Sequence, residues 1–181
     1  MTISSDYAFK ICIFGDTGVG KTSLISRYLN DQFQKDIGKD MEKSMGVDIN
    51  MKKLVVDDIK ISLQIWDLVG EERFKIMLPF YLRGSSGCIF MYDITREKTL
   101  NNIGEWLNIF KNSTAGEQIP IIMVGGKSDL QEMRTISIEK AMSISKSHDF
   151  YDYIECSSKT GENVEVLFNT LIRLILKNAG L

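Results

Sequence analysis

The sequence contains few of the residues that cross-link a chain or break it into parts. Of its 181 residues, three are cysteine and two are proline. Cys12, Cys88 and Cys156 are widely spaced, and each lies in an apolar segment. This favours buried, reduced thiols in a cytosolic protein over a metal or disulfide site. Because no repeat or low-complexity linker divides the chain, we expect a single domain over residues 1–181.

The sequence also lacks long hydrophobic runs and an excess of positive charge. Its apolar stretches are far shorter than the ~20 residues that a membrane-spanning helix needs. The N-terminal MTISSDYAFK lacks the basic region and apolar core of a targeting signal. A net charge of −2 creates no general attraction for nucleic acid or acidic lipid. The hydrophobic content of 44% is sufficient for a sizeable core.

Short apolar runs alternate along the chain with segments of helical spacing. The predicted strands are 8–14, 47–56, 59–66, 87–94, 119–126 and 150–156. The predicted helices are 21–29, 97–112, 137–148 and 163–178. Asp57 and Asp58 indicate a turn, so the second and third strands should form an antiparallel hairpin. The remaining alternation predicts a mostly parallel sheet covered on both faces, with a ligand site beyond the carboxyl ends of its strands.

The stretch GDTGVGKT (15–22) matches the phosphate-loop pattern G-x-x-x-x-G-K-[ST], between a predicted strand and a predicted helix. Its glycines permit close backbone approach, so amides at the helix N-terminus can point at phosphate oxygens. Lys21 would bring a positive charge to β- and γ-phosphates, and the Thr22 hydroxyl would bind Mg²⁺. The alternative is a glycine turn with an incidental lysine. The predicted nucleotide-binding residues are Gly15, Asp16, Thr17, Gly18, Val19, Gly20, Lys21, Thr22 and Ser23.

A second element of the predicted site is a carboxylate at the end of another buried strand. Mg²⁺ keeps several waters and takes few protein oxygens, so one acidic residue near the phosphate loop is expected. Asp67, in WDLVGEERF (66–74), occupies such a position. The alternative role for Asp67 is to cap the end of its strand.

Two loops near the end of the chain have the chemistry of a guanine site. In GGKSDL (125–130), Asp129 can accept both the ring N–H and the exocyclic amine of guanine, whereas adenine presents no such pair of donors. In ECSSKTG (155–161), the Ser158 N–H can donate to the guanine carbonyl. The residues predicted to hold the base are Lys127, Asp129, Ser157, Ser158 and Lys159.

With these motifs the chain resembles a Ras-superfamily small GTPase over 8–178, and it is most similar to the Rab branch. GDTGVGKT resembles the Rab pattern GDSGVGKT, WDLVGEERF resembles WDTAGQERF, and VGGKSDL (124–130) resembles VGNKSDL. The resemblance implies an α/β fold, the three-layer α/β/α fold of P-loop NTPases. Its six-stranded sheet would be mostly parallel with one antiparallel edge strand, and five helices would cover it. The implied activity is that of a switch that binds GTP or GDP with Mg²⁺ and hydrolyses GTP.

The resemblance also assigns roles to residues in the two switch segments. Ser44 takes the place of the threonine that binds Mg²⁺ only with GTP present, and Asp67 would hold the metal through water. The Gly70 N–H would meet the γ-phosphate, and Phe33 would pack on the base. Loss of the Ser44 and Gly70 contacts after hydrolysis would release both segments. Lys21, Gly70 and Glu71 are the implied catalytic residues.

Three departures from the family pattern lie in functional segments. Glu71 replaces the glutamine that orients the attacking water, and a carboxylate can accept hydrogen bonds there but cannot donate them. Gly126 replaces the asparagine that ties the base loop to the phosphate loop, which predicts weaker affinity and faster exchange. The first switch, QKDIGKDMEKS (34–44), is longer than in Rab proteins. Two alternatives therefore stay open: a switch that turns over GTP, and a slow or inactive nucleotide-dependent scaffold.

The resemblance further implies protein partners. Ile49, Trp66 and Tyr81 fall where Rab proteins place a hydrophobic triad that effectors contact; for Ile49 taken alone, core packing is the favoured alternative. Effectors, exchange factors and GTPase-activating proteins are the expected partners, with no nucleic acid. The chain ends at Leu181 without the prenylated cysteines of Rab proteins. We expect a cytoplasmic protein, or one peripheral on membranes if a tail has been removed.

Overall fold

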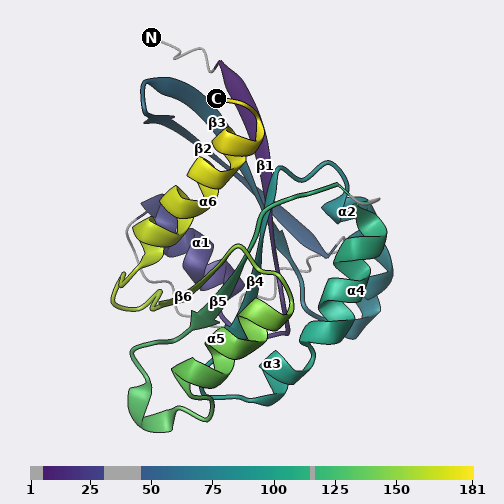
Figure 1. The fold of residues 1–181 in the computed structure, drawn as a ribbon, viewed down its shortest axis with the longest axis vertical. Coiled ribbons are helices and arrows are strands. Elements are labelled where there is room, and N and C mark those ends of the chain that lie inside the picture. Colours follow the sequence, from purple (N-terminus) through teal and green to yellow (C-terminus); the bar gives the residue numbers. More distant parts are fainter. Residues whose placement is uncertain (1–5, 31–45, 115–116) are drawn as a thin grey trace.

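The structure is a computed structural model that describes residues 6–30, 46–114 and 117–181. Its centre is a six-stranded sheet in the order β2-β3-β1-β4-β5-β6 (Figure 1). Neighbouring strands are parallel except β2 and β3, which form the predicted antiparallel hairpin at one edge. The strands are β1 Tyr7–Phe14, β2 Val47–Val56, β3 Ile59–Leu68, β4 Gly87–Asp93, β5 Ile121–Gly126 and β6 Asp152–Cys156.

Helices cover both faces of this sheet. They are α1 Lys21–Asn30, α2 Leu78–Leu82, α3 Lys98–Asn101, α4 Ile103–Ser113, α5 Ile138–Ser147 and α6 Val164–Asn178, with 3-10 turns η1 Glu72–Met77 and η2 Gln131–Met133. Because α3 and α4 are two pieces of the helix predicted over 97–112, interrupted at Asn102, the described residues contain the five implied helices. The spacing pattern alone missed η1 and α2. The sheet and helices confirm the P-loop NTPase fold.

Two hydrophobic cores form because successive side chains of a strand point to opposite faces. On β1, Ile11 and Ile13 join the core shared with α1 and α6. Cys12 and Phe14 join the core on the other face, which α2, α4 and α5 cover. All three cysteines are buried free thiols, as predicted.

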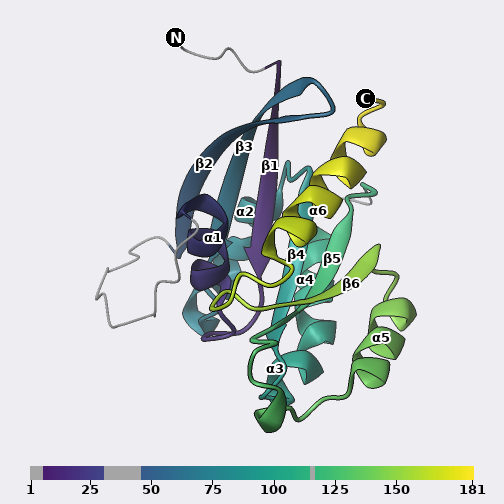
Figure 2. The same ribbon diagram turned by 90° about the vertical axis from the view of Figure 1, so that its left-hand side faces the viewer.

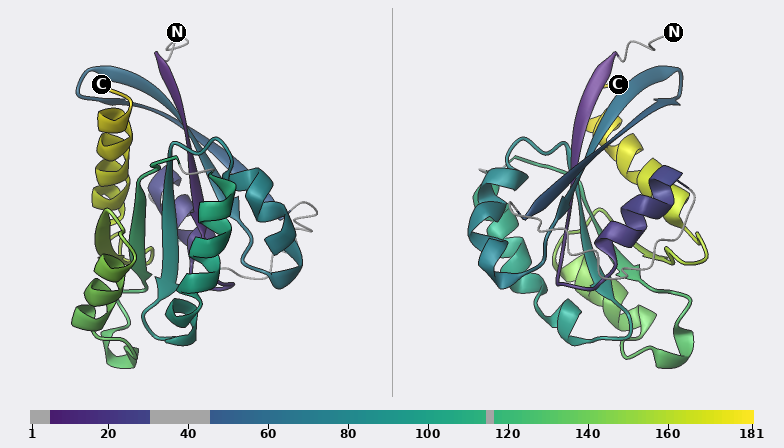
Figure 3. Two further views of the ribbon diagram at one scale, coloured as in Figure 1. Left: turned by 45° about the vertical axis from the view of Figure 1, so that its right-hand side comes forward. Right: turned by 180° about the vertical axis from the view of Figure 1, so that it is seen from behind.

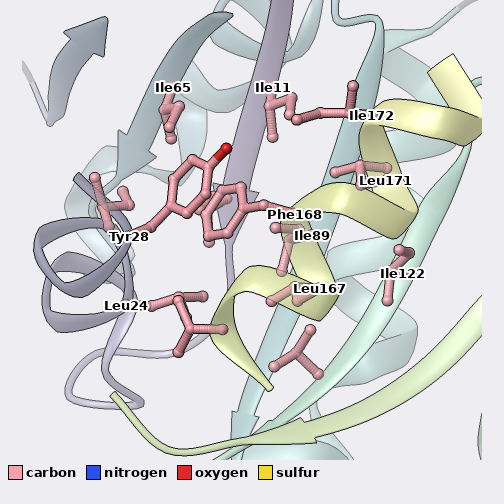
Figure 4. Packing of buried hydrophobic residues seen from close by; sticks show 14 of the residues in the cluster. Ile11, Leu24, Tyr28, Ile65, Ile89, Ile122, Leu167, Phe168, Leu171 and Ile172 are labelled. Atoms are coloured by element: carbon pink, nitrogen blue, oxygen red, sulfur yellow. The ribbon is translucent and has the colours of Figure 1, made fainter. Parts of the chain in front are cut away.

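The face shared by α1 and α6 is closed by an aromatic stack. Figure 2 and the right-hand view of Figure 3 show the two helices side by side on the sheet. The rings of Tyr28 and Phe168 stack with centroids 3.7 Å apart (Figure 4). Burial raises the pKa of Tyr28 to about 12, with a further contribution from Glu165. The stack fixes α1, whose first turn carries Lys21 and Thr22.

None of the described helices has the length and apolar character needed to cross a membrane. The longest of them, α6, has 15 residues, and most of its apolar residues lie in the core, whereas Val166 is exposed.

Candidate nucleotide-binding site

The phosphate loop connects β1 to α1 in a conformation that requires glycine. Gly15, Gly18 and Gly20 have φ values of 140°, 74° and 108°, in the region that side chains disfavour. A Cβ on Gly15 would lie 2.1 Å from the carbonyl oxygen of Met91 on β4. The loop therefore lies directly against the end of β4.

Lys21 spans this loop from the first turn of α1. Its Nζ donates to the carbonyl oxygens of Gly15 at 2.9 Å and Asp16 at 2.8 Å. The side chain is 6% exposed, so its positive charge sits inside the loop and not in solvent. This is the position from which an ammonium group can neutralise a bound phosphate chain.

The side chain of Asp16 serves a different purpose from the rest of the loop. Its Oδ1 accepts from Trp106 Nε1 at 2.8 Å, and its Oδ2 accepts from Asn102 Nδ2 at 2.7 Å. Both donors lie at or just before α4. Any part that Asp16 has in phosphate binding therefore falls to its main chain. The sequence pattern did not predict this anchor between the loop and α4.

Thr22 and Asp67 bring two hard oxygen ligands together from distant parts of the chain. Thr22 Oγ1 donates to Asp67 Oδ2 at 2.5 Å across 45 positions of sequence. Asp67 is 2% exposed while Thr22 is exposed, so the pair lies at the boundary between core and solvent. A hydroxyl and one carboxylate fit the protein's share of a Mg²⁺ shell that waters and phosphate oxygens complete. Ser44, the third predicted ligand, lies outside the described residues.

The loops after β5 and β6 meet around Asp129. Ser157 Oγ donates to Asp129 Oδ1 at 2.6 Å, and Lys159 Nζ lies 3.9 Å from Asp129 Oδ2. Arg27 of α1 donates from Nε to the Ser158 carbonyl at 2.7 Å and also bonds the Lys159 carbonyl. The predicted base-binding residues are thus brought together and tied to α1. Phe33, predicted to pack on the base, lies outside the described residues.

Asp93 joins the base loop to the phosphate loop, a role that the sequence pattern did not reveal. Lys127 Nζ lies 2.6 Å from Asp93 Oδ2 and 3.0 Å from the Gly18 carbonyl oxygen. Arg96 Nε lies 2.9 Å from the same carboxylate, and its Nη2 donates to the Thr17 carbonyl at 3.1 Å. The sequence did contain a signal for Asp93, because this residue ends an apolar strand, as Asp67 does near the end of β3 at the same edge of the sheet.

The electrostatics of Asp93 follow from these partners. Burial alone would raise the pKa of this carboxyl, which is fully enclosed. Hydrogen bonds from Lys127, Thr95 and Arg96 outweigh burial and lower the pKa below its ordinary value. Asp93 is therefore ionised at neutral pH and holds both cations against the phosphate loop.

The segment that follows β3 packs closely on the phosphate loop at Gly70. A Cβ there would lie 2.3 Å from the Gly15 carbonyl oxygen, so only glycine permits this approach. The next residue, Glu71, has a side chain 45% exposed, and its Oε2 lies 2.8 Å from Arg73 Nε. Gly70 lines a cleft of about 320 Å³ that is also bordered by the phosphate loop, η1 and the start of α3. The Glu71 carboxylate is thus paired with a cation of its own segment.

The proposed partner triad is partly exposed. Ile49 is 49% exposed, so core packing, the favoured alternative for this residue alone, is wrong. It is the cross-strand neighbour of Trp66, whose ring centroid lies 6.2 Å from that of Tyr81. Trp66 and Tyr81 are half-buried. Lys10 Nζ lies 3.8 Å from the Trp66 ring centroid, a cation–π arrangement.

Comparisons with known proteins agree with this geometry. Residues 10–177 match the Ras family. Ras-related protein Rab-13 of Canis lupus familiaris is 36% identical over 99% of this chain and 86% of its own length. Ras-related protein RABA5c of Arabidopsis thaliana is 34% identical, over 96% of this chain and 78% of its own. The GTP-binding protein ypt3 of Schizosaccharomyces pombe is 34% identical, over 95% and 78% respectively. The chain therefore belongs to the Ras family, and within the superfamily of small GTPases to the Rab branch.

Proposed function

We propose that residues 1–181 form one small-GTPase domain that binds GTP and GDP with Mg²⁺ and hydrolyses GTP. The observation that carries this proposal is the junction of the two nucleotide loops, where Lys127 contacts both Asp93 and the Gly18 carbonyl oxygen. A phosphate site and a guanine-type base site are thereby held side by side. Lys21 and the loop amides would bind the phosphates, and Asp129 would select guanine.

Thr22 and Asp67 would hold the metal, together with Ser44. When bound, Mg²⁺ would neutralise the charge shared by the β- and γ-phosphates. The remaining electrostatic contribution would come from the buried ammonium of Lys21 and from the Gly70 N–H, which would donate to the γ-phosphate. Loss of that phosphate would leave Gly70 and the first switch without their ligand, which is the basis of switching.

Partners would read this change through the switch segments and the triad of Ile49, Trp66 and Tyr81. Effectors, exchange factors and GTPase-activating proteins are the partner classes that this arrangement suits. By analogy with the Rab-named relatives, the process served would be membrane traffic, with the protein in the cytoplasm or peripheral on membranes.

A slow-hydrolysing scaffold is the second candidate function, and the Glu71–Arg73 pair favours it. In this arrangement the carboxylate is held by a cation of its own segment. A carboxylate also cannot donate a hydrogen bond to the γ-phosphate. Both effects would slow the orientation of the attacking water.

Single-turnover GTP hydrolysis by the wild type and Glu71→Gln tests this step. We expect the glutamine variant to hydrolyse GTP about tenfold faster, which is less than the ~10²–10⁴-fold typical of one positioned acid–base group. The expected gain is smaller because the Glu71 carboxylate can still accept a hydrogen bond from the attacking water. Arg73→Gln is the control for loss of the ion pair, because it frees Glu71 without supplying a donor there. Equal rates for the wild type and Glu71→Gln would remove Glu71 as a determinant of the rate.

A further inference from the structure

A buried methionine lies at the junction between the phosphate loop and the base loop. Met91 of β4 is 1% exposed. A Cβ placed on Gly126, the last residue of β5, would lie 2.4 Å from its Cε. A Cβ placed on Gly20 would lie 3.4 Å from the same atom. The methyl group of Met91 therefore fills the space in front of Gly126 and extends to the phosphate loop.

The same space leads to a polar group of the phosphate loop. A Cβ on Gly126 would lie 3.1 Å from the Val19 carbonyl oxygen. A donor side chain at position 126 could therefore reach the phosphate loop, but glycine has none to offer. Gly126 has no positive φ, so the backbone itself would accept another residue. The nearest obstacle to a side chain there is the Met91 methyl group, the end of a flexible side chain that would have to move within the core to admit one.

We propose that Met91 and Gly126 form a matched pair in which apolar packing replaces a hydrogen bond between the two loops. Met91, buried beneath the two loops, would thus act as a positioning residue for the bound nucleotide. Its methyl fixes the separation of the loops, while Lys127 supplies the charged link beside it. The proposal rests on the proposed function, because its expected consequence is that the wild type releases GDP more slowly than a variant in which this contact is disturbed.

The pairing has a consequence that a single substitution cannot show. Introducing asparagine at 126 would overpack the junction, since Met91 is enclosed in a dense core. Shortening Met91 alone would leave a gap between Gly20 and Gly126, which have no side chains to fill it. Only a shortened Met91 together with asparagine at 126 would allow a polar link to Val19.

A double-mutant cycle on the release of a fluorescent GDP analogue tests this pair, using Met91→Val, Gly126→Asn and the double variant. We expect each single variant to release GDP faster than the wild type. In the Met91→Val background, Gly126→Asn should slow release, giving a coupling of about tenfold between the two sites. An effect of Gly126→Asn that is the same in both backgrounds would overturn the pairing.

Met123→Val is the matched control. Met123 is a fully buried methionine of β5, but it belongs to the core on the other face of the sheet. This variant should lose stability as Met91→Val does and leave GDP release within about twofold of the wild type, since no packing is lost at the loop junction. If both methionine variants accelerate release equally, the effect is general destabilisation and the inference fails.

Urea unfolding of the same variants without nucleotide separates this inference from the proposed function. Coupling between positions 91 and 126 should appear in the unfolding free energies, because the contact belongs to the protein alone. Coupling in unfolding without any GDP binding by the wild type would leave the pair standing and overturn the proposed function. GDP binding without coupling in either measurement would overturn the pair.

Discussion

At the scale of single residues, the site depends on carboxylates that each form a hydrogen bond or an ion pair with a neighbouring side chain. Asp67 accepts from Thr22 at the proposed metal site, and Asp129 accepts from Ser157 at the proposed base site. Asp93 holds Lys127 and Arg96 between the loops. Glu71 differs because its partner, Arg73, is an exposed residue of the same segment. Three of these carboxylates thus link separate elements of the site, whereas Glu71 is paired only within its own segment and, under the proposed function, would influence the rate of GTP hydrolysis.

Asp93→Asn should destabilise the domain by about 2 kcal/mol at neutral pH, because it replaces a charged acceptor of several hydrogen bonds. The lowered pKa of Asp93 means that the unfolded state takes up the proton first as pH falls. The stabilisation is therefore complete above the ordinary aspartate value of 3.8 and is lost as pH falls through the lower folded-state pKa.

Urea unfolding of the wild type and Asp93→Asn across pH 3–7 measures this difference. The gap between their free energies of unfolding should be constant near neutrality and narrow only in the acid range. A gap that is already narrowing at neutral pH would contradict a lowered pKa for Asp93.

At the scale of elements, α4 supports the phosphate loop through its own start. At the break between α3 and α4, the side-chain amide of Asn102 and the indole of Trp106 both donate to the Asp16 carboxylate. The spacing over 97–112 predicts one continuous helix and gives no sign of an interruption at Asn102. Helical periodicity does not register a side-chain contact with a loop 86 residues away, and this is why the interruption was not predicted.

Trp106→Phe keeps an aromatic ring in the core and removes the Nε1–H donor to Asp16. We expect a loss of about 1 kcal/mol or slightly more in unfolding free energy, because the acceptor is charged. Trp66→Phe is the matched control, since among the described residues the Trp66 Nε1 is buried without a hydrogen-bond partner. Equal losses for the two variants, measured by urea unfolding, would show that the bond to Asp16 contributes nothing.

At the scale of the whole molecule, the fold could be predicted because its signals are local. The strand pattern and the glycine-lysine loop lie in contiguous segments, and each of the six predicted strands overlaps an observed one. The short turns η1 and α2 were missed, since a few residues such as LPFYL carry no clear period. The Asp93 cluster and the Met91–Gly126 contact depend on residues that only the folded sheet brings together.

The sheet also explains why the predicted site converges. The loops after β1, β3, β4, β5 and β6 leave the sheet at neighbouring carboxyl ends, as expected for an open α/β sheet. Residues 15, 67, 93, 127 and 157 therefore meet although they are spread over most of the chain. Their exact partners follow from side-chain packing, which the sequence pattern alone does not specify.

The most direct test of the central claim is the identity of the nucleotide that the purified protein carries, measured by chromatography after denaturation. We predict GDP or GTP at close to one per chain. Added GTP should displace it, whereas ATP should not, and Asp129→Ala should lose this discrimination because guanine's paired donors lose their acceptor. Bound adenine nucleotide, or protein that binds neither GTP nor GDP when Mg²⁺ is supplied, would contradict the account.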